Sequence, residues 1–255
     1  QLKILRTYAK EETSNGHTIF VIPAFGSIIL GWDELLIEAM QDFDVVYFES
    51  REKGSSKLVK KAKMDMEIYS EDMKEIIRQL KLEENKLITL ASSSSVPIIG
   101  YTIAYKNLQP KLTVLVGPIM KIPIPTIIRL MALFLPTFFV NLIRKLSFIW
   151  IKRKRTATPE QAAKYIRAGK EADPKKWKRG LGYFGTATYE KIYPLIDTKV
   201  LVIDESEDKM HETEITREIA SLIPNAELID LKTNKNTHSK PIVDTIREFI
   251  QRSKT

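Results

Sequence analysis

The stretch that decides the fold is Leu87-Ile-Thr-Leu90, followed by Ala91-Ser-Ser-Ser-Ser95 and Val96-Pro-Ile-Ile-Gly100. The first segment is apolar and of strand length, and the last one begins a helical pattern. A strand, a tight turn of small residues and a helix form the context in which a strained turn projects one serine from a sheet. Ser93 occupies the tip of that turn and is the candidate nucleophile. The alternative is that the serine run is a polar loop or a helix cap.

Further apolar runs of strand length lie on both sides of this unit. They are nearly continuous in apolar residues, which indicates strands whose two faces are both covered by helices. With the strand at 86–90, the runs predict strands at 18–22, 44–48, 112–116, 199–203 and 226–230. Residues 2–8 alternate apolar and polar side chains, as an antiparallel edge strand does.

Amphipathic segments at 64–80, 96–106, 212–223 and 239–252 predict helices between these strands. The repeated strand–helix order predicts an α/β fold with a mostly parallel sheet flanked by helices. The order is interrupted once, by helical and proline-rich sequence. We therefore expect a core of residues 1–118 and 187–255, with 119–186 inserted over the sheet as a helical cap.

A group of carboxylates follows the predicted strand 199–203, in Asp204-Glu-Ser-Glu-Asp208. Such residues are often helix caps or solvated charges. At the carboxyl end of a strand they can also orient a catalytic histidine. Asp208 is the predicted acid, and Asp204, Glu205 and Glu207 are the competing candidates.

His238 follows the last predicted strand, after a polar loop, and precedes the last helix. His17 lies at the start of a strand and His211 at the start of a helix. A serine hydroxyl is a weak nucleophile unless an imidazole accepts its proton, and a carboxylate orients that imidazole. Ser93, Asp208 and His238 therefore predict a hydrolytic triad.

The segment Pro23-Ala-Phe-Gly-Ser27 follows the strand predicted at 18–22. Attack by a serine creates an oxyanion, which backbone N–H groups stabilise. The N–H groups of Phe25 and Ser94 are the predicted oxyanion hole. The alternative for this segment is a flexible turn.

The order serine, aspartate, histidine, each after a strand, resembles the α/β-hydrolase family over nearly the whole chain. Pro23-Ala-Phe-Gly26 is similar to the family's His-Gly-x-Gly oxyanion loop, and Ala91–Ser95 to its Gly-x-Ser-x-Gly elbow. Arg51-Glu-Lys-Gly-Ser-Ser56 resembles the glycine-and-serine loop after the next strand. The chain departs from the family where Ala91 and Ser95 replace the elbow glycines and Pro23 replaces the histidine.

Residues 121–151 are the most apolar stretch of the chain, but a charge and several prolines argue against a continuous membrane-spanning helix. The resemblance implies that an insertion here is a lid over an acyl pocket. The alternative is that these residues only pack the cap onto the sheet. The predicted pocket residues are Leu130, Phe134, Phe138 and Phe139.

The formal net charge is +8, and basic clusters occur at 152–155 and 175–179. Basic residues beside aromatic ones can seat a protein on an anionic membrane, and the alternative is a solvated cationic face. No nucleic-acid-binding motif, phosphate loop or zinc motif is present, and the chain has no cysteine. We expect no cofactor, no metal and no nucleic-acid partner, and a cytoplasmic protein with peripheral membrane contact as an option.

The sequence thus predicts a serine hydrolase that cleaves a carboxylic ester with an apolar acyl group through an acyl-enzyme. Its expected partner is a small-molecule or lipid ester. Two alternatives remain open. One is an acyltransferase, in which an alcohol or amine intercepts the same intermediate. The other is a non-catalytic lipid-binding protein, which the replaced elbow glycines favour.

Overall fold

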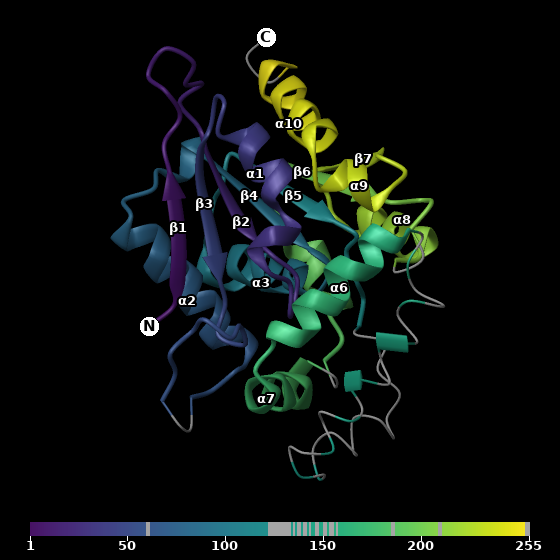
Figure 1. Ribbon diagram of the computed structural model, residues 1–255. Helices are drawn as coiled ribbons and strands as arrows, with labels where there is room; N and C mark the ends of the chain where they lie inside the picture. Colours follow the sequence, from purple (N-terminus) through teal and green to yellow (C-terminus); the bar gives the residue numbers. More distant parts are fainter. Residues whose placement is uncertain are drawn as a thin grey trace.

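The computed structural model describes residues 1–59, 62–121, 158–184, 187–208 and 211–252, with isolated residues between 134 and 156. The strands of this part are β1 (Lys3–Thr7), β2 (Thr18–Ile22), β3 (Asp44–Glu49), β4 (Leu87–Ser92), β5 (Leu112–Val116), β6 (Val200–Asp204) and β7 (Ala226–Asp230). They form one sheet in the order β1-β3-β2-β4-β5-β6-β7 (Figure 1). β1 pairs with β3 antiparallel, and the other pairs are parallel.

Helices lie on both faces of the sheet (Figure 1). The helices of the described residues are α1 (Asp33–Ala39), α2 (Met66–Gln79), α3 (Val96–Lys106), α6 (Pro159–Glu171), α7 (Pro174–Phe184), α8 (Thr213–Leu222), α9 (Asn234–Thr237) and α10 (Lys240–Arg252). Short 3-10 helices span Ile29–Gly31, Glu84–Lys86, Ser93–Ser95 and Glu190–Leu195.

Local sequence explains where several helices begin. The Asp65 side chain accepts a hydrogen bond from the Ile68 N–H at the start of α2, and Thr158 does the same for the Gln161 N–H in α6. Such caps satisfy N–H groups that have no partner within the helix. α3 ends at Asn107, whose left-handed conformation closes the last turn.

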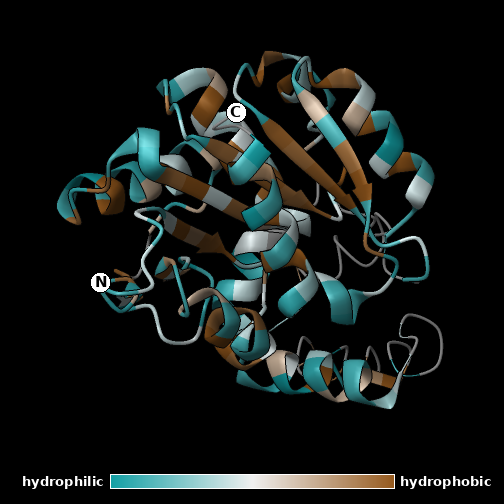
Figure 2. Ribbon diagram, turned by 90° about the horizontal axis from the view of Figure 1, so that it is seen from above, coloured by the Kyte–Doolittle hydropathy of each residue, from teal (hydrophilic) through white to brown (hydrophobic). Residues whose placement is uncertain are grey.

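Alternate strand residues build two hydrophobic cores. Phe20 and Val46 pack on the face that α2, α3 and α8 cover, whereas Ile19 and Val45 pack on the face of α1 and α10. The inner strands run mostly in brown through the middle of the molecule in Figure 2, because both of their faces are buried. The predicted α/β fold is confirmed, including the antiparallel edge strand.

The chain between β5 and β6 carries α6 and α7, which lie over the carboxyl ends of the parallel strands (Figure 1). An isolated bridge between Lys121 and Thr188 joins the two ends of this segment. The cap boundaries at 119 and 186 stay a prediction. In the described part of the chain, no helix is long and apolar enough to cross a membrane.

The predicted pocket residues of the cap are only partly described. Leu130 and Phe138 lie outside the described residues. Phe134 is 81% exposed and Phe139 is 42% exposed. The predicted acyl pocket therefore stays a prediction.

Candidate active site

The serine turn between β4 and α3 has the geometry of a strained elbow. Ser93 has a φ angle of +50°, in a left-handed region that costs a residue with a Cβ about 1–2 kcal/mol. The preceding strand β4 and the following helix α3 are both largely buried, and Ser93 lies in the turn at the carboxyl end of β4, in the middle of the sheet. Strain of this kind persists where the surrounding structure holds it in place.

The Ser95 side chain makes hydrogen bonds that stabilise the serine turn. Its buried hydroxyl donates to the Ile22 carbonyl at 2.6 Å and accepts from the Ser92 N–H at 3.1 Å. The Ser95 side chain thereby ties the elbow to β2, the strand that leads into the predicted oxyanion loop.

His238 lies directly after the short helix α9. Its Nδ1 is 2.9 Å from the Asn234 carbonyl oxygen, which can only accept, so Nδ1 carries the proton and Nε2 can act as a base. The Thr237 hydroxyl is 3.0 Å from the same Nδ1 and donates to the Glu205 carboxylate. The imidazole ring packs against Trp32, with ring centroids 4.4 Å apart.

The pKa of His238 is lowered from 6.5 to about 4. Burial is the largest cause, and the Lys164 cation in α6 is the second. Glu205 acts in the opposite direction. The imidazole is therefore neutral near pH 7, which is the state that a general base requires.

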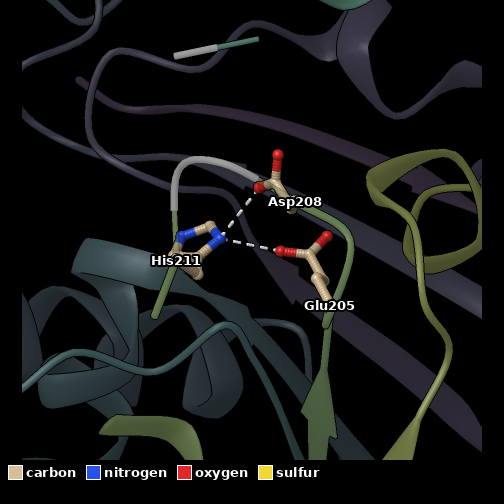
Figure 3. Close-up of side chains that lie close together, drawn as sticks. All are labelled: Glu205, Asp208 and His211. Carbon is tan, nitrogen blue, oxygen red and sulfur yellow. Dashed lines mark hydrogen bonds and ion pairs between the residues drawn. The ribbon is translucent and has the colours of Figure 1, made fainter. Parts of the chain in front are cut away.

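A second buried histidine, His211, faces two carboxylates (Figure 3). Its Nδ1 is 2.8 Å from Glu205 and 3.2 Å from Asp208. Although burial lowers the pKa of His211, its hydrogen bonds with Asp208 and Glu205 raise it to about 9. Burial raises the pKa of Glu205, but His211 outweighs this effect and holds it at about 2. His211 is therefore protonated near pH 7, and its positive charge pairs with the buried Glu205 carboxylate.

These three residues also offer metal-ligand atoms within 4.8 Å of one another. The His211 ion pairs account for the cluster without a metal. The His211 ring also lies against Gly117 at the end of β5, where an added Cβ would come within 2.8 Å of the ring.

The contacts that the structure gives to Ser93, Asp208 and His238 are not those of an assembled triad. In the described part of the chain, no hydrogen bond joins Ser93 to His238. Asp208 accepts from the Gln161 amide at 2.9 Å and pairs with His211, and no described contact links it to His238. Glu205, a competing candidate in the sequence, is the carboxylate linked to His238, through Thr237.

Sequence reasoning missed the role of His211. The sequence pattern that could have predicted it is the spacing of Glu205, Asp208 and His211, which follow one another at intervals of three residues just after β6. Residues this close to a strand end can fold back on one another in a single turn.

The predicted oxyanion loop lies against the elbow. The Phe25 N–H donates to the Ser94 hydroxyl at 2.7 Å, so a substrate oxygen bound to this N–H would have to replace that hydroxyl. The Phe25 ring packs on Trp177 of α7, with ring centroids 5.4 Å apart. Helix α7, the predicted oxyanion loop and the serine turn thus meet at one place.

No protein-family model matches the chain, and no curated protein matches its sequence. Solved structures match it over nearly its whole length. A thermophilic esterase from Thermogutta terrifontis has a TM-score of 0.79 at 15% identity, covering 100% of this chain and 94% of its own. A hydrolase from Oleispira antarctica has a TM-score of 0.78 at 19% identity, with 97% and 94% covered. The enol-lactonase from Burkholderia xenovorans LB400 has a TM-score of 0.74 at 15% identity, with 98% and 96% covered.

Proposed function

We propose that this chain, which has the α/β-hydrolase fold, is a serine hydrolase that cleaves carboxylic esters through an acyl-enzyme on Ser93. The observation that carries the proposal is the strained elbow at Ser93, with the Phe25 N–H beside it. The neutral His238, whose Nε2 can accept a proton, supports the same chemistry. The esterases among the structural neighbours agree with it.

In the proposed reaction, the Ser93 side chain turns toward His238, and its Oγ attacks the ester carbonyl carbon while Nε2 takes the proton. Hydrogen bonds of this kind are often long or absent without substrate. The imidazolium gives the proton to the departing alcohol. Water then attacks the acyl-enzyme with the same base and releases the acid and Ser93. Phe25 N–H and Ser94 N–H are the proposed donors to the oxyanion.

The proposed acyl group is apolar. The apolar sequence of 121–151 and the exposed Phe134 and Phe139 side chains support this choice. Covering exposed aromatic side chains with an acyl chain lowers the free energy, because it removes apolar surface from water.

Hydrolysis of a p-nitrophenyl ester series of increasing acyl length tests this function. We expect saturable release of nitrophenol, with kcat/KM rising from the shortest ester to longer ones. Repeating the assay with an added alcohol distinguishes a hydrolase from an acyltransferase. An acyltransferase would form mainly the new ester, whereas a hydrolase would form mainly the free acid. Absence of turnover with every ester would contradict the proposal and favour a non-catalytic protein.

Glu205 is the proposed acid of the triad, acting through Thr237. We expect Glu205→Gln to lower kcat by about 100-fold, less than the loss of about 10,000-fold measured for such an acid elsewhere, because the Asn234 carbonyl still fixes the His238 tautomer. Asp208→Asn is the matched control and should change kcat by less than about threefold, since Asp208 contacts His211 and Gln161. The reverse ranking, in variants with unchanged circular dichroism, would return the role to Asp208.

The low pKa of His238 predicts the pH dependence. A base works only when deprotonated, so kcat/KM should fall on the acid side near the value of about 4 for His238, and not near 6.5. Lys164→Met removes a cation that lowers this pKa and should move the acid limb to higher pH. Glu205 and His211, the other charged groups acting on His238, are kept.

Lys170→Met is the control for this measurement, because Lys170 is an exposed lysine of the same helix. Its profile should match that of the wild type. An equal shift in both variants, or a wild-type limb near 6.5, would contradict the assignment of His238 as the base. Circular dichroism at each pH separates titration from unfolding.

A further inference from the structure

A buried lysine that the reaction above does not use contacts the oxyanion loop. Lys53 lies just after β3, and its side chain is 4% exposed. Its ammonium donates to the Ala24 carbonyl oxygen at 2.6 Å. That carbonyl belongs to the same peptide group as the Phe25 N–H, because one planar amide joins the two residues.

The two ends of this peptide group are therefore held from opposite sides. In a trans peptide the C=O and N–H bonds point in opposite directions. Lys53 holds the carbonyl end, and the N–H end faces the elbow, where it donates to the Ser94 hydroxyl at 2.7 Å. A cation on the carbonyl also polarises the amide and makes its N–H a stronger donor.

The lysine is kept in place by a buried acidic partner. Glu52 is 2% exposed and lies 3.3 Å from the Lys53 ammonium. Its carboxylate accepts from Ser50 at 2.7 Å and from Tyr69 at 3.0 Å. Burial lowers the pKa of Lys53, and Glu52 opposes this effect. A buried ion pair adds little net stability, so stability alone does not explain why this cation lies beside the Ala24 carbonyl.

The cap holds the same region. Lys176 of α7 donates to the Lys53 carbonyl at 2.7 Å and also to the Ser56 carbonyl. The next residue, Trp177, packs on Phe25 and lies so close to Gly26 that an added Cβ would come within 2.7 Å of its ring. The oxyanion loop is thus held between α7 and the segment that carries Lys53.

We propose that Lys53 is a positioning residue for the oxyanion hole, which fixes and polarises the Ala24–Phe25 peptide so that its N–H is directed at the substrate oxygen on Ser93. This inference rests on the proposed hydrolase function. It does not require Lys53 to touch the substrate.

Lys53→Met tests the inference through the balance of kcat and KM. An interaction that acts mainly in the transition state lowers kcat and leaves KM nearly unchanged. We expect kcat to fall by about 10- to 100-fold, somewhat less than removal of a donor itself. The inhibition constant of an alkylboronic acid, which forms a tetrahedral adduct with the serine, should rise by the same factor. Unchanged kcat, or a rise in KM alone, would overturn the inference.

Lys74→Met is the matched control, because the Lys74 ammonium also donates to a backbone carbonyl, that of Lys106, away from the site. Its kcat should equal that of the wild type. If Lys53→Met does not fold, Glu52→Gln combined with Lys53→Met removes the buried pair without leaving a lone charge. The same loss of kcat is expected from the double variant.

Hydrogen–deuterium exchange of the 23–28 segment separates the two proposals. It should rise in Lys53→Met and stay unchanged in Lys74→Met, whether or not an ester is turned over. An inactive wild type with this exchange pattern means that only the proposed function fails. An active wild type, with exchange and kcat both unaffected by Lys53→Met, means that only the role of Lys53 fails.

Discussion

Replacing Ser93 by alanine is expected to lower kcat for the preferred ester by about 10,000-fold or more, because it removes the hydroxyl that forms the proposed acyl-enzyme. The residual rate would come from binding and from the oxyanion donors, which the substitution leaves in place. Steady-state kinetics with the p-nitrophenyl esters provide the measurement. A variant that keeps more than a tenth of the wild-type kcat would contradict the role of Ser93.

Ser93→Gly is the companion variant, since it removes the hydroxyl and also the strain at +50°. Both variants should be inactive. The glycine variant should be more stable than the alanine variant by about 1 kcal/mol, because only glycine adopts this conformation without a Cβ clash. Denaturant unfolding measures the difference, and equal stabilities would remove the argument that the elbow is strained.

Replacing His238 by alanine has the second largest expected effect, a loss of kcat of about 1,000- to 10,000-fold. Without the imidazole, no base accepts the Ser93 proton in the attack. Because the side chain packs on Trp32, His238→Gln is a second variant that fills more of the space and should be equally inactive.

His17→Ala is the control for His238, because His17 lies before β2, at the amino end of the parallel strands. Its kcat should match the wild type. If His238→Ala kept its activity and His211→Asn lost it, the base would have to be reassigned to His211.

Most of the fold could be predicted because the strands are continuous apolar runs. The predicted ranges 18–22, 112–116 and 226–230 coincide with β2, β5 and β7, and the range 96–106 coincides with α3. α1 was missed because it is short, with apolar residues only at Leu35, Leu36, Ile37 and Ala39. Seven residues are too few for a helical period to stand out.

The candidate site was predictable only where position along a strand determines it. Ser93 and His238 each follow a strand, and their places can be read from the sequence. The carboxylate that is linked to His238 cannot be chosen in this way, because the turn after β6 decides which carboxylate faces which histidine. In that turn the Asp208 N–H donates to the Glu205 carbonyl at 2.8 Å, and Glu205, not Asp208, is linked to His238 through Thr237.

The contact between Lys53 and the Ala24 carbonyl joins residues 29 positions apart. No local pattern reveals such a contact, since it depends on how two loops meet above neighbouring strands. The sequence indicated only that residues 51–56 resemble a loop that α/β-hydrolases commonly have after this strand.

Covalent labelling with an alkyl fluorophosphonate, located by peptide mass spectrometry, tests whether Ser93 is the nucleophile. We expect one adduct on the wild-type protein, on the Ser93 hydroxyl, and none on Ser93→Ala. The neighbouring serines 92, 94 and 95 should remain unmodified. An equal adduct on Ser93→Ala, an adduct at another residue, or no labelling of the folded wild type would contradict it.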